Sequence, residues 1–222
     1  MAATTTTSAA FAAALLCAAF LAAGAGAGGH HRQPKQFDGD LVSQTCANAT
    51  SDFCRLRLTK AYCVAALRSD ERSAAAKDPR DLALVAVDLV GKAAAGASAK
   101  IDAALRAGAG GPAKGDGDAE RDLRYCLVDY AVVARVVPEC RRLVEQHEGA
   151  GGGRRQNPFF HFECVRKLVD AAYGCVDAMM LRKEVADAVA GNEIDEVHQR
   201  ATLAKAIVEQ MLGEDDDWPE HY

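Results

Sequence analysis

The stretch that decides the fold carries four cysteines in two pairs, DLRYCLVDYAVVARVVPEC over residues 122–140 and CVRKLVDAAYGC over residues 164–175. Cys126 and Cys140 lie fourteen residues apart, and Cys164 and Cys175 lie eleven apart. At about 100° and 1.5 Å per residue, both spacings return nearly to one side of an α-helix, and they span roughly 21 and 16 Å. Each pair is therefore expected to lie along one face of its own helix.

Two antiparallel helices would bring these cysteines together in reversed order. Cys126 then faces Cys175, and Cys140 faces Cys164. The two spans differ by about one helical turn, which a bend at Pro138 would absorb. The sequence predicts a helical hairpin joined by two disulfide bridges, which is typical of a protein from an oxidising compartment.

Apolar residues recur at helical spacing in four segments, separated by short polar or glycine-rich breaks. We expect helices over about residues 82–106, 118–147, 158–183 and 193–212. Asp81 is the expected N-cap of the first helix and Asn192 that of the last. No alternating strand pattern of useful length is present. The predicted fold class is all-α: an antiparallel four-helix bundle preceded by an N-terminal helical hairpin arm held by a disulfide.

The chain begins with an apolar run at residues 11–23 that is too short to span a bilayer and fits a signal peptide. The segment before that run contains no Lys or Arg, which departs from the usual pattern. We expect no later segment to reach transmembrane length, and hence no membrane partner. The predicted domains are a signal peptide (1–27), a polar connector (28–39), a helical domain (40–213) and an acidic tail (214–222).

Charge and cysteine count limit the partners. The net charge is −5 without a dense basic patch, which argues against binding to nucleic acid. Seven of the eight cysteines remain once Cys17 leaves with the leader, so one thiol is spare or bridges to another chain. Asn48 begins the tripeptide Asn-Ala-Thr, an acceptor for N-glycosylation and consistent with secretion.

Catalytic motifs are missing from the sequence: there is no nucleophile elbow, no H-E-x-x-H and no phosphate-binding loop. His161 and Cys164 share a helix face and would suit a metal, but a disulfide from Cys164 to Cys140 is the favoured reading. We therefore predict a rigid binding module with no cofactor and no catalysis of its own.

A family resemblance rests on several ordered pieces of sequence. They are LVSQTC ending at Cys46, YCVAALRSDERSA starting at Tyr62, LALVAVD starting at Leu82, and LRYCLVDY ending at Tyr130, followed by Cys175. Over about residues 40–212 they resemble the plant invertase and pectin methylesterase inhibitor family. The resemblance implies secretion to the apoplast, with the vacuole as the alternative, and the arm-plus-bundle architecture already predicted.

The resemblance also bears on the cysteines. It implies a bridge from Cys46 to Cys63, with Cys54 to Cys63 as the rival pairing, and it agrees with the Cys126–Cys175 bridge. The Cys140–Cys164 bridge rests on the facing-helix argument alone. Cys54 is then the spare thiol, through which a disulfide-linked dimer would form.

The implied function is inhibition of an acid invertase or of a pectin methylesterase. Invertase-inhibiting members resemble one another in a Pro-Lys-Phe motif, which here falls on Pro158, Phe159 and Phe160, with Phe159 in place of the lysine. The competing interpretation is that Pro158 starts the helix and both rings anchor it on the core. We expect invertase as the target, with pectin methylesterase as the alternative. A non-inhibitory secreted binding protein, or a carrier of a small apolar ligand, is the alternative of another class.

Overall fold

The computed structural model describes residues 40–51, 58–108, 117–147 and 157–213. The chain divides into two units, Met1–Phe37 and Asp38–Tyr222, and every described residue belongs to the second. The predicted signal peptide, connector and acidic tail lie outside the described residues, as does Cys54, so they remain predictions.

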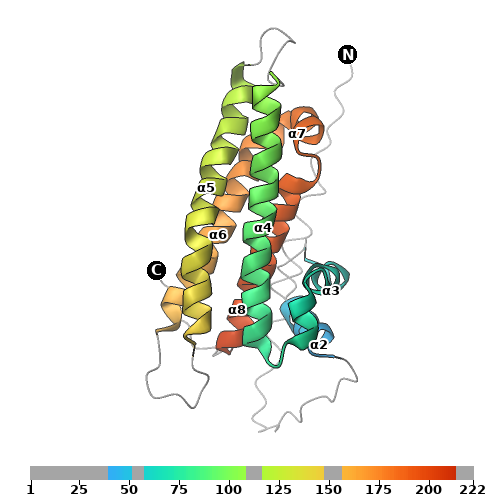
Figure 1. Cartoon of the computed structure of the whole chain (residues 1–222), viewed down its shortest axis with the longest axis vertical. Helices are drawn as coiled ribbons and strands as arrows, with labels where there is room; N and C mark the ends of the chain where they lie inside the picture. Colours follow the sequence, from blue (N-terminus) through green and yellow to red (C-terminus); the bar gives the residue numbers. More distant parts are fainter. Residues whose placement is uncertain (1–39, 52–57, 109–116, 148–156, 214–222) are drawn as a thin grey trace, which may run out of the picture. The chain divides into compact units, whose positions relative to one another are not determined.

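The described residues form α-helices and short 3-10 helices and contain no β-strand, which confirms the all-α class. Figure 1 shows the long helices side by side, with the helices of the arm against one end. The elements are α2 (Leu41–Ala49), α3 (Lys60–Arg68), η1 (Glu71–Ala75), α4 (Pro79–Arg106), α5 (Gly117–Glu145), α6 (Pro158–Met179), η2 (Met180–Arg182), α7 (Lys183–Val189) and α8 (Glu193–Leu212).

The long helices form a ring in which α4 packs on α5 and α8, and α6 packs on α5 and α8. Contacts between α6 and α8 run in opposite chain order. The Tyr173 ring lies 5.6 Å from the His198 ring, whereas Lys205 Nζ lies 5.3 Å from the Phe162 ring. These two helices therefore run antiparallel, as the hairpin of α5 and α6 does.

Two disulfides join α5 to α6. Cys126 is bonded to Cys175 with their Cα atoms 4.5 Å apart, and Cys140 is bonded to Cys164 with Cα atoms 5.4 Å apart. These are the pairs expected from facing helices, and their reversed order makes α5 and α6 antiparallel. α5 continues through Pro138 as one helix.

The core of the bundle is built from the apolar stripe of each long helix, as amphipathic helices require. Each long helix contributes fully buried side chains to this core, for example Ile101, Leu123, Leu168 and Ile207. The helix α4 is also apolar over much of its surface, with an 18-residue window of mean hydropathy 1.5. By length and composition it could cross a membrane, so the expectation that no later segment reaches that length is wrong. Half of that window is buried inside the bundle, as expected of a core helix.

Neither of the two predicted helix N-caps is formed as expected. α4 begins at Pro79 with Asp78 as its N-cap, because the Asp78 carboxylate accepts a hydrogen bond from the Asp81 backbone N–H (3.0 Å). Asp81 lies inside the first turn and accepts instead from the Lys77 N–H (2.8 Å). Asn192 occupies the N-cap position of α8, but its side chain makes no capping hydrogen bond.

The third long helix ends earlier than residue 183. α6 stops at Met179, and the chain passes through η2 into the short helix α7, which was not predicted. Arg182 turns back towards α5, where its guanidinium forms ion pairs with Asp122 (3.2 Å) and Asp118 (3.3 Å). These ion pairs join η2 to the N-terminal part of α5.

The arm is held by a disulfide and by a network of charges. Cys46 of α2 is bonded to Cys63 of α3, which is the pairing that the family resemblance implied. Buried Asp70, which caps η1, accepts from Arg72 Nε (2.9 Å) and from Lys92 Nζ of α4 (2.8 Å). Arg72 reaches Asp88 of α4 (2.7 Å), to which Arg141 of α5 also binds. The network therefore links the arm to two bundle helices.

Candidate functional site

The first turn of α6 carries the residues that the sequence marked as a binding motif. Pro158 occupies the first helical position, where a backbone N–H would have no hydrogen-bond partner within the helix, so proline loses nothing there. The Asn157 side chain caps this turn by accepting from the Phe159 N–H (3.0 Å). Pro158 is exposed, and Phe159 and Phe160 are 42% and 57% exposed. This exposure contradicts the interpretation in which both rings anchor the helix on the core.

The two phenylalanine rings lie against each other. Their centroids are 6.0 Å apart and their planes are inclined by 72°, an edge-to-face arrangement favoured between aromatic rings. Aromatic residues, phenylalanine among them, are enriched in the buried core of protein interfaces. The first turn of α6 therefore presents a paired aromatic surface to solvent.

The next residues of α6 are the ones that anchor it. His161 is buried, and its Nε2–H donates to the Leu143 carbonyl of α5 (2.9 Å). Burial lowers the pKa of His161, so this imidazole stays neutral near pH 7. Three residues on, Cys164 is bridged to Cys140. The metal-site interpretation of His161 and Cys164 is therefore excluded, and no group of metal-binding side chains occurs among the described residues.

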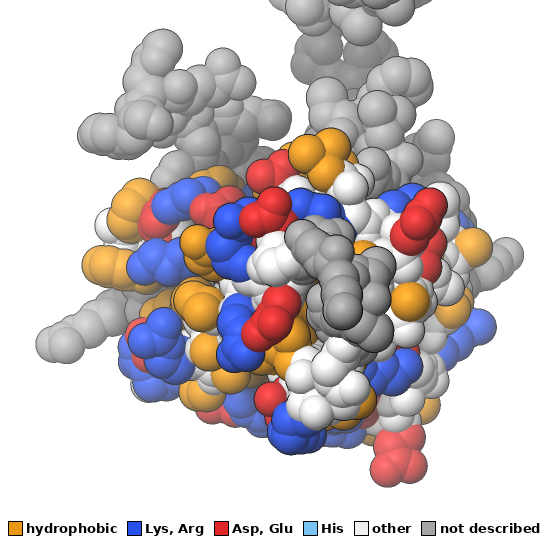
Figure 2. All heavy atoms as spheres, turned by 90° about the horizontal axis from the view of Figure 1, so that it is seen from above, with side chains coloured by type: hydrophobic (Ala, Val, Ile, Leu, Met, Phe, Trp, Pro, Cys, Tyr) orange, Lys and Arg blue, Asp and Glu red, His pale blue; other side chains and the backbone are white. Residues whose placement is uncertain are grey.

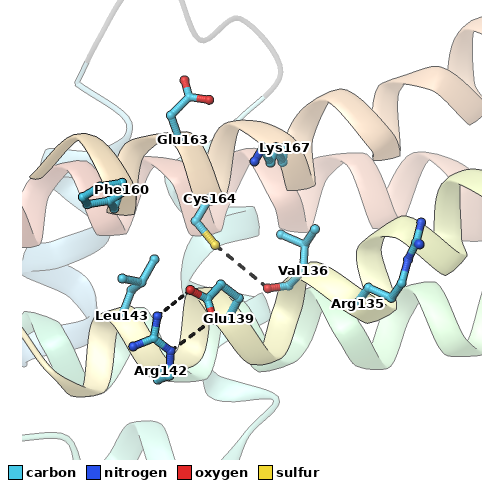
Figure 3. A pocket seen from close by; sticks show the side chains of 9 residues that line it. All are labelled: Arg135, Val136, Glu139, Arg142, Leu143, Phe160, Glu163, Cys164 and Lys167. Atoms are coloured by element: carbon cyan, nitrogen blue, oxygen red, sulfur yellow. Dashed lines mark hydrogen bonds and ion pairs between the residues drawn. The ribbon is translucent and has the colours of Figure 1, made fainter.

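A groove between α5 and α6 extends from this aromatic surface. Figure 3 shows it from close by, with Phe160 and Lys167 projecting from α6 and Arg135 from α5. Its volume is about 540 Å³. The residues that line it are Arg135, Val136, Glu139, Arg142, Leu143, Phe160, Glu163, Cys164 and Lys167.

The charges of this groove are unevenly paired. Arg142 holds Glu139 at 2.5 Å and lowers the pKa of that carboxyl. Arg166 holds Glu163 at 2.9 Å with the same effect on its pKa, to which the charge of Lys167 also contributes. The structure gives neither Arg135 nor Lys167 an ion pair within its described part. Both are exposed cations.

Other surfaces of the bundle are less distinctive. Figure 2 views the end that lies uppermost in Figure 1, and positive and negative side chains are interspersed over the visible face. Along α5, Tyr125 and Val128 are 55% and 61% exposed and lie three residues apart, which places them on one helix face. They form an exposed apolar pair on α5, and Met180 and Leu181 are a further exposed apolar pair just beyond α6.

Comparison with known proteins bears on the whole of this architecture. The family model described as plant invertase/pectin methylesterase inhibitor matches residues 40–207. The chain belongs to this family. A search of curated proteins found no match. Members of the family are inhibitors rather than enzymes, and membership supports an inhibitor of invertase or of pectin methylesterase.

Sequence reasoning located the exposed turn of α6 but missed its neighbours. Pro158, Phe159 and Phe160 lie together at the helix start, and Asn48 lies exposed in the last turn of α2. The groove was not expected. The only signal in the sequence is the seven-residue spacing from Phe160 to Lys167, which places both on one face of α6.

Proposed function

We propose that this protein is a secreted inhibitor of an acid invertase that blocks the active-site cleft with the first turn of α6. The observation that carries the proposal is the exposure of Phe159 and Phe160, 42% and 57%, on a turn that begins with Pro158. The third phenylalanine of α6, Phe162, is more deeply buried than these two. An exposed apolar pair of this kind is suited to contact with a partner surface.

The first turn is held in place before any partner arrives. Asn157 caps it, His161 bonds it to α5, and the Cys140–Cys164 bridge follows one turn later. Ordering a flexible side chain at an interface costs about 0.5–1.5 kcal/mol, so a preformed turn loses less on binding. Inhibition without turnover follows from a rigid surface that fills the cleft.

Phe159, in place of the lysine of the motif, removes a positive charge from the surface that the turn would present to a glycosidase. Such enzymes carry a pair of carboxylates in the active site. A phenylalanine at this position contributes apolar area and no charge, so binding by the turn itself rests on the two rings and on the exclusion of water. If each ring contributes about 2 kcal/mol when buried in the interface, the two together make the dissociation constant about a thousandfold lower than it would be without them.

A second candidate function, inhibition of a pectin methylesterase, is favoured by the exposed pair on α5. Tyr125 and Val128 lie on a bundle helix rather than on the first turn of α6. An inhibitor that uses the helix surfaces of the bundle would bury this pair. Secretion to the apoplast, cleavage of the leader, a glycan on Asn48 and dimerisation through Cys54 are parts of the proposal for either target.

The test compares two matched double variants, Phe159→Ala/Phe160→Ala and Tyr125→Ala/Val128→Ala, each titrated against an acid invertase. The first should weaken inhibition by on the order of 100-fold or more, because both anchoring rings are lost. The second removes a similar exposed apolar pair and should leave inhibition within about twofold.

Thermal unfolding serves as the control for folding, since neither pair is in the core. Undiminished inhibition by the Phe159→Ala/Phe160→Ala protein would overturn the assignment of the site. Loss of pectin methylesterase inhibition in the Tyr125→Ala/Val128→Ala protein, with invertase unaffected by the wild type, would establish the second candidate instead.

A further inference from the structure

The groove between α5 and α6 has an aromatic end and a cationic end. Phe160 lies at one end, and Lys167 lies seven residues further along the same helix, about 10 Å away. Cys164 Sγ is 3.9 Å from the Val136 carbonyl oxygen, so these two residues face each other across the groove. Arg135 precedes Val136, which places it at nearly the same height along the bundle as Lys167.

The cationic end is exposed to solvent. Glu139 and Glu163 also line the groove, but each is held by an arginine three residues further along its own helix. The carboxylates of Glu139 and Glu163 are therefore already in ion pairs with these arginines, and Lys167 adds a longer-range attraction to Glu163 without an ion pair of its own in the described part of the chain. Arg135 and Lys167 are exposed, and the structure records no ion pair for either among the residues that it describes.

The floor of the groove is apolar and rigid. Val136 and Leu143 of α5 line it together with Cys164, whose bridge to Cys140 holds the two helices at this level. A partner segment lying here would contact apolar side chains along its length and cations at one end. A contact with these properties fits a peptide segment with acidic side chains.

We propose that this groove is the electrostatic half of the interface with the target enzyme, in which Arg135 and Lys167 bind carboxylates of an acidic surface segment. The inference rests on the proposed function, because Phe160 belongs both to the exposed turn and to the groove. A partner that buries Phe159 and Phe160 and extends along α6 meets Lys167 two turns later. Continuity with the aromatic pair selects the target enzyme as the occupant, and the two cations select a segment of it that carries carboxylates.

The consequence is a division of roles within one interface. The aromatic rings set how slowly the complex dissociates, because they are desolvated on binding. The two cations act mainly on the association rate and on its salt dependence, as charges at the rim of an interface do. Neither cation touches reacting atoms, so both are positioning residues for the complex.

The experiment measures association and dissociation rates of the full mature protein with an acid invertase at about 20 mM and 500 mM NaCl. The test variant is Arg135→Gln/Lys167→Gln. It should slow association by on the order of 3- to 10-fold at low salt and by less than twofold at high salt, where charges are screened. Its dissociation rate should change much less than that of Phe159→Ala/Phe160→Ala.

The matched control is Lys60→Gln/Lys183→Gln, which removes the same charge from exposed positions on α3 and α7. It should associate within about twofold of the wild type at both salt concentrations. A zero-length carbodiimide cross-link adds a direct readout, because it joins the Lys167 amine to a carboxylate of the enzyme only where the two are in contact. Peptide mapping of the cross-linked complex should identify Lys167.

The outcomes separate this inference from the proposed function. If the wild type inhibits and Arg135→Gln/Lys167→Gln associates at the wild-type rate at low salt, with no cross-link at Lys167, the groove inference is overturned while the aromatic site stands. A slowdown equal to that of the control pair also overturns it, because total charge would then explain the effect. A wild type that does not bind invertase overturns the proposed function and this inference together.

Discussion

Replacement of Asp70 by asparagine tests how the arm is held on the bundle. The Asp70 carboxylate is buried and accepts four hydrogen bonds, from the Arg72 backbone N–H and from three side-chain nitrogens of Arg72 and Lys92 (2.8–3.1 Å). In Asp70→Asn, an amide NH₂ group replaces one carboxylate oxygen and faces the donors of Arg72 and Lys92, from which it cannot accept a hydrogen bond. Each hydrogen bond to a charged group contributes about 1.5–3 kcal/mol to the free energy of unfolding, which is lost when the bond is broken.

The net loss should lie near the lower end of that range. Arg72 and Lys92 are 44% and 63% exposed and turn to water once Asp70 no longer holds them. We expect Asp70→Asn to lower the free energy of unfolding by about 2 kcal/mol at pH 7. For a chain of this size that is a fall in Tm of roughly 4–8 °C.

The loss should depend on pH in a defined direction. Hydrogen bonds from Arg72, then those from Lys92, hold the pKa of Asp70 well below its ordinary value of 3.8, against the opposing effect of burial. A carboxyl with a lowered pKa in the folded state stabilises the protein fully above its unfolded pKa and loses that contribution as pH falls below it. The difference between wild type and Asp70→Asn should be constant above about pH 5 and shrink below about pH 4.

Urea unfolding followed by circular dichroism at pH 7, 5 and 3 measures this difference, with the neighbouring Glu71→Gln as control. Glu71 is exposed, so its variant should match the wild type within about 0.5 kcal/mol. A difference for Asp70→Asn that stays the same from pH 7 to pH 3 would refute the ion-pair reasoning. No difference at any pH would show that the network does not hold the arm.

Two further predictions concern the bundle itself. Cys126→Ala/Cys175→Ala opens a bridge with a sequence separation of 49 and should lower the free energy of unfolding by about 4 kcal/mol in urea titrations; a change below about 1 kcal/mol would contradict it. Gly96→Ala should raise stability by about 0.5–1 kcal/mol, because nothing lies within 4 Å of the added methyl group, whereas Gly191→Ala should lower it by about 1 kcal/mol, because Gly191 has φ +54°. Equal effects at both glycines in thermal unfolding would disprove the second prediction.

Much of the bundle was readable because apolar spacing reports which face of a helix is buried. The predicted bounds of α8 agree with the structure, since its apolar seam runs unbroken and Gly191 closes the preceding turn. The start of α4 was also marked in the sequence: Pro79 favours the first helical position, so Asp78 rather than Asp81 was the better N-cap. That signal was present and was misjudged.

Other features could not be read because they depend on contacts between distant residues. The end of α6 has no glycine or proline, and the ion pairs of Arg182 with Asp118 and Asp122 join residues about sixty positions apart. Likewise, Lys92 meets Asp70 only after the arm packs on α4. Helical periodicity does not report such pairs.

The candidate site was predicted only in part, because it too depends on contacts between residues far apart in the sequence. The sequence located Pro158, Phe159 and Phe160 at a helix start, but an apolar pair there suits either the core or a partner. Only the fold leaves both rings exposed while His161 is buried behind them. The cationic end of the groove was missed because Arg135 and Lys167 come from different helices.

The most direct test of the proposed function is a paired inhibition assay with the oxidised mature protein, titrated against an acid invertase and a pectin methylesterase over roughly pH 4–7. Sucrose cleavage should be abolished near equimolar inhibitor, while pectin demethylation should be unaffected. Inhibition of the pectin methylesterase alone would contradict the assignment of the α6 turn. A folded, fully bridged protein that slows neither enzyme would contradict the proposal of an inhibitor for these targets.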